Sequence, residues 1–450
     1  MVIKMESDLE KLIQNDNFLC PGCGRRHHGG LKDCVIGENA LGALPSLAAR
    51  YGHKPFVLCD ADTYAAAGER VCALLTDSGI DCRVYIIERK TPAPDEYIVG
   101  EALMALGQNR DLIIAVGGGV INDTCKLLAA NGKLPYIMTA TAPSMDGFAS
   151  STSSMERGGL KVSLPSKCPD AVIGDSGVLA SAPKKLIRSG IGDMLAKHTS
   201  LVEWRIAHLL LGEYYCPTIA EMVSDALDVC ERSAPGAIDG DLSACEDIMR
   251  GLTLAGLSMS YAGLSRPASG MEHYISHILD MRALGSGGHA EPHGIQCALG
   301  TLVTIRAYEL LSSRRFDRER ALSSAARFDR DEWFSHLREK LGRGAEAMIS
   351  GELKEGKYEL KKHAERLGVI LAKEDELRGL ISALPSSAEL RYFMIGLGLP
   401  TTADELGISK GELKEAFIMA KDIRDKYVLG RLLWDLGLLD EIADEVVSEF

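Results

Sequence analysis

A group of histidines near the middle of the chain is the densest chemical signal in the sequence. Four of the 11 histidines fall within residues 273–293, and they are His273, His277, His289 and His293. His273 and His277 are four residues apart, so on a helix they share one face. A single histidine is more often structural, but this crowding among glycine-rich segments predicts a metal site. Imidazole suits Zn²⁺, Ni²⁺ or Fe²⁺, and a catalytic ion keeps one position open for water or substrate.

The third ligand of such an ion should be a carboxylate or a further histidine from elsewhere in the chain. The best candidate is Asp193 in the stretch S-G-I-G-D-M-L-A-K-H, which spans residues 189–198. We expect Asp193 where a glycine-rich turn enters a helix, and an ordinary N-cap is the alternative reading. His198 lies five residues further on and would point to a different face, so we expect a structural role for it.

A glycine turn earlier in the chain predicts a phosphate site. Gly117, Gly118 and Gly119 follow the apolar run 111–116 and precede a helical segment. Glycines allow backbone N–H groups to approach a phosphate, and the start of the helix adds its positive dipole end. The turn departs from the usual G-x-G-x-x-G pattern of dinucleotide-binding proteins. The alternative to a phosphate site is a tight turn that binds no ligand. The strand–turn–helix context favours dinucleotide binding.

Asp60 ends another apolar run, Phe56-Val57-Leu58-Cys59-Asp60. An acid at the tip of such a strand can accept hydrogen bonds from an adenosine ribose and repels a 2′-phosphate, which favours NAD over NADP. A helix-capping or turn role is equally compatible with the local sequence.

The N-terminal segment contains the only close cysteine pair among 12 cysteines. Cys20 and Cys23 are followed by His27 and His28, which together look like half of a zinc knuckle. A second C-x-x-C is missing, so we expect a structural or metal-free role rather than a zinc site. The other cysteines should be reduced and buried.

The elements that must position these residues change character along the chain. Apolar runs expected as strands alternate with helical segments up to about residue 180, which predicts a parallel sheet with crossover helices. The strands are expected at 54–60, 81–87, 111–116, 135–139 and 171–174, and the helices at 64–77, 95–107 and 121–131. From 183 to the end the pattern is almost entirely helical. We therefore expect an extension (1–34), an α/β NAD-binding domain (35–182) and an all-α metal-binding catalytic domain (183–450).

Composition excludes several classes of protein. The 450 residues are 46% hydrophobic and 25% charged, as in a globular chain, and the net charge of −13 argues against nucleic-acid binding. No apolar run is long enough for a membrane span, and residues 1–18 lack a signal-peptide core, so we expect a cytoplasmic protein. The charged stretch 312–378 fits either solvated helices or a mobile insertion.

Several segments together resemble the sn-glycerol-1-phosphate dehydrogenases, a branch of the dehydroquinate synthase-like and iron-containing alcohol dehydrogenase-like enzymes. The D-G-x-A-S loop at 146–150 and the S-R-P-x-S-G-x-E-H-x-x-x-H stretch at 265–277 separate this branch from plain glycerol dehydrogenases. Other matching segments are the glycine turn with Asp123 and Lys126, residues 141–150, 190–197, 293–294, 421–427 and 436–439. The resemblance covers most of residues 35–450.

The resemblance implies a function for individual residues. It implies metal ligation by Asp193, His273 and His293, and it places the NAD pyrophosphate on Gly117, Gly118 and Gly119. We add Asp60, Asp123, Thr139 and Ser144 to the cofactor site. Asp146 is implied to bind a substrate hydroxyl, with a simple turn acid as the alternative. Lys197 and His277 are implied to flank the reacting carbonyl, and His277 could deliver a proton. Independently of the resemblance, we expect Arg266 and Lys161 to bind the substrate phosphate, and a surface or capping role is the alternative for Arg266.

The implied fold is the dehydroquinate synthase-like pair of domains, with the active site in the cleft between them. The implied reaction is reversible, metal-dependent reduction of dihydroxyacetone phosphate to sn-glycerol 1-phosphate with NAD(P)H, with Zn²⁺ or Ni²⁺ expected ahead of Fe²⁺. A homo-oligomer is also expected. The alternatives are a dehydrogenase for glycerol or another polyol, a lyase of the dehydroquinate synthase type, and a binding protein that has lost catalysis.

Overall fold

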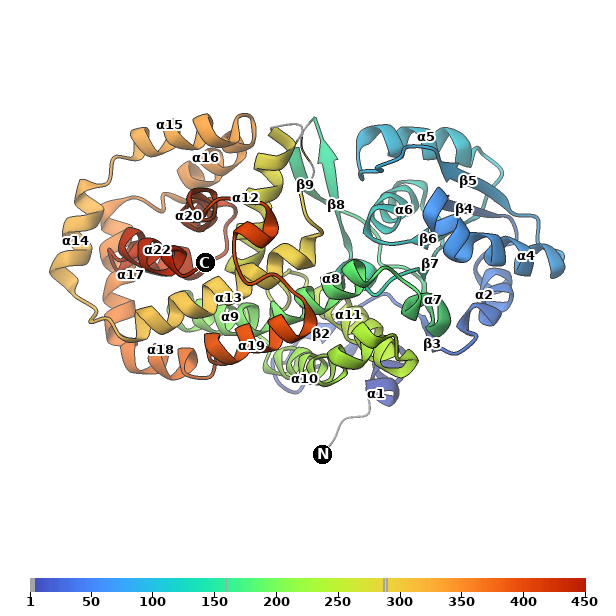
Figure 1. Cartoon of the computed structure of the whole chain (residues 1–450), viewed down its shortest axis with the longest axis horizontal. Helices are drawn as coiled ribbons and strands as arrows, with labels where there is room; N and C mark the ends of the chain where they lie inside the picture. The colour runs from blue at the N-terminus through green and yellow to red at the C-terminus, as the bar shows by residue number, and fades with distance from the viewer. Residues whose placement is uncertain (1–4, 159, 286–287, 289) are drawn as a thin grey trace. The chain divides into compact units, whose positions relative to one another are not determined.

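The computed structural model describes residues 5–158, 160–285, 288 and 290–450, and Figure 1 shows its helices and strands. These residues form two compact units. Unit 1 comprises Met1–Met194 and Pro217–Ser265, and unit 2 comprises Leu195–Cys216 and Arg266–Phe450. The predicted domain boundary at residues 182–183 falls within unit 1, and the predicted three-part division stays a prediction. No helix of the described residues is apolar and long enough to span a membrane.

Unit 1 is built on a six-stranded sheet in which every strand pair is parallel. The sheet order is β3-β10-β7-β6-β4-β5. The strands are β3 (Asp33–Gly37), β4 (Pro55–Asp60), β5 (Arg83–Ile87), β6 (Leu112–Gly117), β7 (Tyr136–Ala140) and β10 (Ala171–Asp175). β6, β7 and β10 are buried along their whole length, which explains their continuous apolar sequences. The predicted parallel α/β fold is confirmed.

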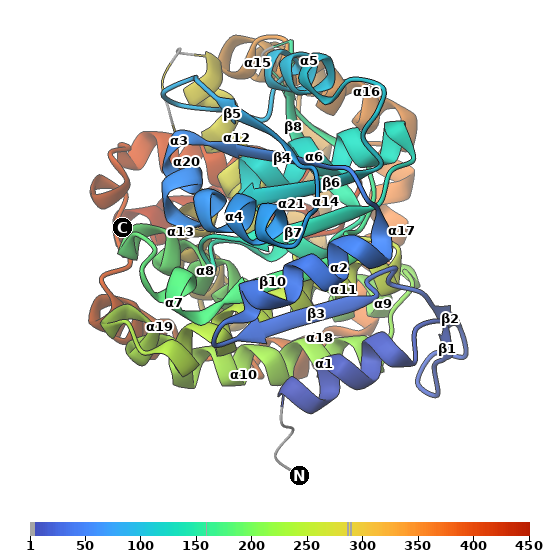
Figure 2. The ribbon, with the colours of Figure 1, turned by 90° about the vertical axis from the view of Figure 1, so that its right-hand side faces the viewer.

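Helices cover the sheet, as the alternating sequence predicts. The predicted helices correspond to α4 (Glu69–Asp77), α5 (Glu96–Leu106) and α6 (Gly119–Gly132), whereas α2 (Leu44–Tyr51) was not predicted. Side chains of α2 and α4 pack with those of β4, β6, β7 and β10 in one apolar core, and Figure 2 shows these two helices lying over the same face of the sheet. The helix predicted at 64–77 starts earlier, as α3 (Ala61–Thr63) and a π-helical turn η2 (Tyr64–Gly68) before α4.

The strand order contains a switch point between β4 and β6. After β4 the chain crosses to β5 on one side, and after β6 it crosses to β7 on the other. Ligands of open α/β sheets bind outside the carboxyl ends of the strands at such a point. Asp60 ends β4 and Gly117 ends β6, so both predicted cofactor residues lie at this switch point.

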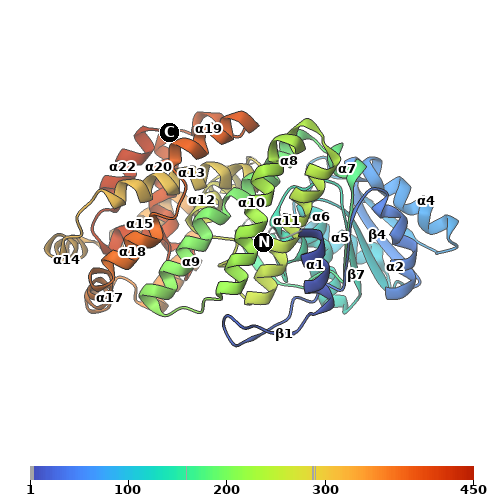
Figure 3. The ribbon, with the colours of Figure 1, turned by 90° about the horizontal axis from the view of Figure 1, so that it is seen from below.

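Several elements of unit 1 did not follow from the sequence, and three of them matter most for the sheet and its loops. The first is the edge strand β3, and the second is an antiparallel hairpin of β8 (Thr152–Arg157) and β9 (Leu160–Pro165). The third is a short 3₁₀ turn, η3 (Asp146–Ala149), which contains the D-G-F-A stretch. Unit 1 also contains the helices α1 (Met5–Gln14), α7 (Ser176–Ala180), α8 (Lys184–Leu195), α10 (Pro217–Asp239) and α11 (Leu242–Ala262). Figure 3 shows α10 and α11 side by side.

The described residues of unit 2 are helical without any strand, as expected for the C-terminal part. Its central helix α13 (His293–Ser312) is buried on most sides and packs against α12 (Met271–Gly285) and α9 (Lys197–Leu211). The remaining helices are α14 (Arg318–Arg327), α15 (Arg330–Leu341), α16 (Gly344–Glu355), α17 (Leu360–Ala372), α18 (Glu374–Ile381), α19 (Ser387–Leu397), α20 (Lys410–Met419), α21 (Leu429–Asp435) and α22 (Leu439–Ser448).

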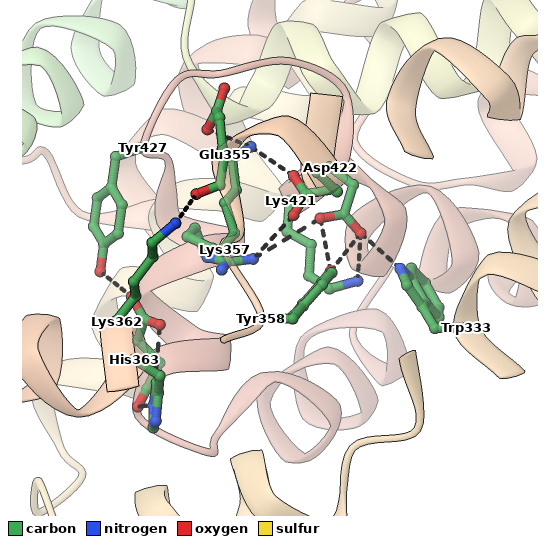
Figure 4. Close-up of polar contacts among 12 residues, drawn as sticks. Trp333, Glu355, Lys357, Tyr358, Lys362, His363, Lys421, Asp422 and Tyr427 are labelled. Carbon is green, nitrogen blue, oxygen red and sulfur yellow. Dashed lines mark hydrogen bonds and ion pairs between the residues drawn. The ribbon is translucent and has the colours of Figure 1, made fainter. Parts of the chain in front are cut away.

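The charged stretch 312–378 forms helices, α14 to α18, rather than a mobile insertion. A buried polar network ties it to the C-terminal part of the chain (Figure 4). Asp422 accepts hydrogen bonds from Trp333 Nε1 and Tyr358 Oη, both at 2.7 Å. The Lys421 ammonium is 3.0 Å from the same carboxylate and 3.4 Å from the Trp333 ring centroid. These contacts make the stretch part of the fold of unit 2.

Candidate active site

The glycine turn sits at the predicted place, at the end of β6 and the start of α6. Gly118 is the N-cap of α6, so the helix begins at Gly119, two residues before the expected start. A Cβ on Gly117 would lie 2.6 Å from Ile121 Cγ1, which explains why glycine is needed there. At Gly118 and Gly119 a Cβ would meet Ser144 and Met145 only at 3.7 Å. Gly118 and Gly119 leave the start of α6 without side chains, which suits a phosphate at a helix N-terminus.

Two hydroxyl residues predicted for the cofactor lie beside this turn. Thr139 of β7 is paired in register with Val116 of β6, directly before the glycines. Its Oγ1 is buried and has no hydrogen-bond partner among the described residues. A buried hydroxyl without a partner is costly, and a bound ligand would satisfy it. Ser144, which approaches Gly118, is also buried.

Asp60 caps a helix. Its Oδ1 accepts hydrogen bonds from Thr63 N at 2.8 Å and from Thr63 Oγ1 at 2.9 Å, and Thr63 Oγ1 accepts the N–H of Asp60 at 3.0 Å. This reciprocal arrangement is a capping box at the start of α3. The structure therefore shows the helix-capping role of Asp60, and its contact with an adenosine ribose stays a prediction.

Asp123 and Lys126 form a buried pair beneath the β8–β9 hairpin. The Lys126 ammonium lies 3.5 Å from Asp123 Oδ1 and donates to Ser150 Oγ and to the carbonyl of Thr152, both at 2.8 Å. Burial raises the pKa of Asp123 above its ordinary value, against the opposing effect of the lysine charge. Burial likewise lowers the pKa of Lys126. The pair anchors the end of the D-G-F-A-S loop, and Lys161 on β9 is near enough to act on Asp123 through its charge.

Asp193 is held by the backbone of the loop that contains Asp146. Its Oδ2 accepts the N–H of Asp146 at 2.8 Å. The expectation that a glycine turn precedes Asp193 is wrong, because Gly190 and Gly192 lie inside α8 with Asp193. A Cβ on Gly190 would lie 1.9 Å from the carbonyl oxygen of Pro143, so glycine allows α8 to touch the loop.

The other side of the same loop rests on α11. A Cβ on Gly256 would lie 2.4 Å from the carbonyl oxygen of Asp146 and 3.0 Å from Ala149 N. Two helices of unit 1 thus approach the loop backbone at glycines. The side chains of Asp146 and Asp193 are both buried in unit 1, which fits a site that binds cations or hydroxyls.

The histidines of unit 2 gather between α12 and α13. The ring centroids of His273 and His293 are 4.9 Å apart, and those of His277 and His293 are 5.7 Å apart and nearly parallel. His273 Nδ1 is 2.8 Å from Glu272 Oε1, and His293 Nδ1 is 2.9 Å from Ser276 Oγ. Contacts of this kind at Nδ1 orient many metal-bound histidines, whose other ring nitrogen then faces the ion.

Glu272 is the buried carboxylate that orients His273. Burial alone would raise its pKa, but hydrogen bonds from His273, Thr199 Oγ1 and the N–H of Gly270 hold the pKa below its ordinary value. Glu203 of α9 shows the opposite, since burial and the charge of Glu272 raise its pKa to about 8. These opposite shifts favour the charged form of Glu272, beside His273, over that of Glu203.

Lys197 and Arg266 are both buried in unit 2. Lys197 Nζ donates to the carbonyl of Ala268 at 3.0 Å. Arg266 makes two parallel bonds to Glu213, at 2.6 Å and 2.9 Å, and a third to the carbonyl of Tyr427 at 2.9 Å. The guanidinium charge is thus matched inside the protein, so Arg266 has neither the surface nor the capping position considered as its alternative.

Comparison with known proteins decides the family. The model of the iron-containing alcohol dehydrogenases matches residues 35–183. A glycerol-1-phosphate dehydrogenase (NAD(P)+) of Bacillus velezensis is 30% identical over 401 residues, which cover 88% of this chain and 89% of that protein. The chain belongs to the glycerol-1-phosphate dehydrogenase family. The enzyme of that name from Halalkalibacterium halodurans is 29% identical over 90% of this chain and 93% of its own.

Solved structures support the fold that this family shares with iron-type alcohol dehydrogenases. The glycerol dehydrogenase of Schizosaccharomyces pombe superposes with a TM-score of 0.60 at 19% identity, over 93% of this chain and 91% of that one. The family consists of oxidoreductases, and NAD(P) with a divalent metal is consistent with it. The buried Thr139 hydroxyl and the histidine pair with engaged Nδ1 atoms fit these two groups.

Sequence reasoning missed four residues around the histidines. Ser276 and Glu272 orient the two rings, and Cys297 Sγ lies 3.6 Å from His293 Nε2. Ligand atoms of His277, Asp280 and His293 also lie within 4.8 Å of one another. The spacing His293-x-x-x-Cys297 is the same as that of His273 and His277 and could have revealed the cysteine. His289 lies outside the described residues.

Proposed function

We propose that this chain catalyses the reversible reduction of dihydroxyacetone phosphate to sn-glycerol 1-phosphate with NAD(P)H. The observation that carries the proposal is the 30% identity to a glycerol-1-phosphate dehydrogenase (NAD(P)+) over 88% of the chain. NAD is the favoured cofactor because a carboxylate, Asp60, ends β4 at the switch point of the sheet.

One divalent ion, Zn²⁺ or Ni²⁺, is proposed to be held by His273, His293 and Asp193. Support comes from three hydrogen bonds that orient these side chains. Glu272 engages His273, Ser276 engages His293, and the N–H of Asp146 engages Asp193. Two imidazoles and one carboxylate are a common ligand set of catalytic metals, with a further position open to substrate.

When bound, the metal polarises the substrate carbonyl as a Lewis acid and NAD(P)H supplies the hydride. His277 is proposed to move the proton of the substrate hydroxyl, because its ring stacks beside that of His293. Lys197 is proposed to orient the substrate carbonyl from its buried position. Asp146 is proposed to accept a substrate hydroxyl, and Ser144 to bind the cofactor next to Gly118.

Of the two predicted phosphate ligands, Lys161 is proposed ahead of Arg266. The Arg266 guanidinium forms an ion pair with Glu213 and donates a third hydrogen bond to the carbonyl of Tyr427. A substrate phosphate would therefore have to displace Glu213 from this ion pair. Lys161 lies on the β8–β9 hairpin, close to Asp123 of α6. We expect Lys161→Ala to raise the KM for dihydroxyacetone phosphate without changing the KM for NADH.

The test is NADH oxidation by metal-stripped protein with dihydroxyacetone phosphate, before and after addition of Zn²⁺ or Ni²⁺. Activity should return only with metal, and His273→Ala should abolish both metal binding and turnover. The exposed His208 gives a matched control, since His208→Ala should behave as the wild type. Turnover with glycerol or another polyol, but not with dihydroxyacetone phosphate, would contradict the proposed substrate. Release of phosphate without net consumption of NADH would indicate a lyase.

A cytoplasmic location and a homo-oligomeric state remain further parts of this proposal. Light scattering of the purified protein tests the oligomeric state, and cell fractionation tests the location. Binding of nucleic acid is not expected, in view of the net charge of −13.

A further inference from the structure

The segment with Cys20 and Cys23 folds as a small hairpin in unit 1. Strands β1 (Phe18–Leu19) and β2 (Arg26–His27) are antiparallel, with Phe18 opposite His27. The turn is closed by Cys20 N–H to Arg25 O at 2.8 Å and by Gly24 N–H to Cys20 O at 2.9 Å, and Gly24 has a φ of +70°. Ligand atoms of Cys20, Cys23 and His27 lie within 4.8 Å of one another. A hairpin that gathers two thiols and an imidazole in this way is typical of small zinc sites.

The orientation of His27 points to a ligand on its other nitrogen. Its Nδ1 lies 2.9 Å from the carbonyl oxygen of Tyr261, and its Nε2 lies 3.3 Å from Cys23 Sγ. Because a carbonyl only accepts, the proton of a neutral ring is on Nδ1 and the lone pair is on Nε2. Metal-bound histidines are commonly fixed in this way by a backbone carbonyl. His27 is only 2% exposed, so its ring orientation is held by the surrounding protein.

The neighbouring His28 is engaged elsewhere. Its Nδ1 lies 2.7 Å from Asp16 Oδ2, and its side chain is 71% exposed. Asp16 also accepts the N–H groups of Gly29 and Gly30, at 2.8 Å and 3.2 Å. Of the two adjacent histidines, the buried one therefore faces the cysteines and the exposed one does not.

The chain also provides a third thiol, Cys216, next to the residues that pack against this turn. A Cβ on Gly22 would lie 2.4 Å from Thr218 Oγ1 and 3.1 Å from Pro217 Cγ, so the turn packs against the start of α10. Cys216 is joined to Pro217 by one peptide bond. Its covalent link keeps it close to this packing contact.

We propose that Cys20, Cys23 and His27 bind a structural Zn²⁺, with Cys216 as the fourth ligand. The missing second C-x-x-C favours a structural or metal-free role, but the cysteine pair needs only one histidine and one distant cysteine to complete a tetrahedral set. The ion would fix the N-terminal hairpin against Tyr261, whose ring already meets that of Phe18 edge-on at 5.5 Å. This site would be separate from the ion proposed for catalysis, and it does not depend on the proposed function.

The experiment counts metal ions in the full-length protein by elemental analysis and repeats the count after replacing ligands. Cys23→Ser and His27→Gln should each lower the zinc content by one ion per chain, and Cys82→Ser, a half-buried cysteine outside the hairpin, should leave it unchanged. The same loss is expected in a His273→Ala background, which separates this ion from the catalytic one. Cys216→Ser should weaken retention of the ion against a chelator by about 10-fold or more.

Cobalt substitution identifies the donor atoms. The thiolate-to-cobalt absorption should disappear in Cys23→Ser and persist in Cys297→Ser, which removes the thiol beside His293. If the serine variant does not fold, the wild-type protein can be tested instead. After a chelator has removed the zinc, adding zinc back should slow hydrogen exchange at the backbone amides of residues 18–30. Unchanged zinc content in Cys23→Ser, or a Cys20–Cys23 disulfide in protein isolated under reducing conditions, would overturn the proposal.

Discussion

The backbone N–H of Asp146 donates a hydrogen bond to the Asp193 carboxylate at 2.8 Å. This bond joins the loop after β7 to the interior of α8, and it holds a candidate metal ligand through a main-chain group that side-chain substitution of Asp146 leaves intact. The approach is possible because Gly190, one turn before Asp193, faces the carbonyl of Pro143. The position of the carboxylate therefore depends on the absence of a side chain at residue 190.

Gly190→Ala should displace α8 from the loop, because a methyl group 1.9 Å from the carbonyl oxygen of Pro143 cannot be accommodated. We expect metal affinity to fall about 10- to 100-fold, as for other losses of a ligand-orienting contact. Metal titration and kcat/KM measure the effect. Gly100→Ala is the control, since a Cβ on Gly100 in α5 meets nothing within 4 Å and should slightly stabilise the helix. Wild-type metal affinity in Gly190→Ala would contradict the role of this contact.

The sequence predicted the sheet well because its strands are buried on both faces. Continuous apolar runs such as that of β6 alternate with helices, and this pattern permits few arrangements other than a parallel sheet. The half-buried strand β3, at the sheet edge, carries a weaker apolar signal and was missed. The β8–β9 hairpin was missed because its polar sequence lacks the apolar run that marks a buried strand.

The sequence predicts those site residues whose reactive side chains are clustered along the chain. It does not predict the residues whose roles depend on how two helices pack together. Crowding singled out His273 and His293, whereas Ser276 and Glu272 acquire their roles only from the way α12 and α13 meet. Gly190 and Gly192 were interpreted as a turn because glycine is rare in helix interiors. At Gly190 the close approach to the carbonyl of Pro143 outweighs the low helix propensity of glycine.

Asp60→Asn should shift the cofactor preference towards NADP. Asparagine caps helices as well as aspartate does, so the capping box with Thr63 and the stability of the protein should be retained. Only the negative charge that repels a 2′-phosphate is removed. The ratio of kcat/KM for NADPH to that for NADH should therefore rise, with little change in Tm. An unchanged ratio would show that Asp60 is a helix cap alone.

Lys126→Met should destabilise unit 1 because it leaves the buried Asp123 carboxylate without its ion-pair partner. Asp123 would remain buried without its cation, which typically costs about 3 kcal/mol or more. Adding Asp123→Asn should restore part of this loss, and a double-mutant cycle in urea measures the coupling between the two side chains. Independent, additive effects would contradict the pair. The bonds to Ser150 and to the Thr152 carbonyl are lost in both proteins, so recovery should stay incomplete.

Lys421 should make the stability of unit 2 depend on pH above neutrality. Burial lowers the pKa of Lys421 to about 8, although the charge of Asp422 opposes this shift. A lysine whose pKa is lower in the folded protein contributes stability that is present above its ordinary pKa and is lost as pH falls through the folded value. The free energy of unfolding of the wild type, relative to Lys421→Met, should therefore rise by about 2 kcal/mol between pH 7.5 and 10.

Urea unfolding of the wild type and Lys421→Met at several pH values measures this difference. Lys414, at 36% exposure and paired with Asp444, supplies the control, and Lys414→Met should follow the wild type across the same pH range. A difference between wild type and Lys421→Met that stays constant with pH would mean that Lys421 titrates normally. In that case its contacts with Asp422 and the Trp333 ring would outweigh the cost of its burial.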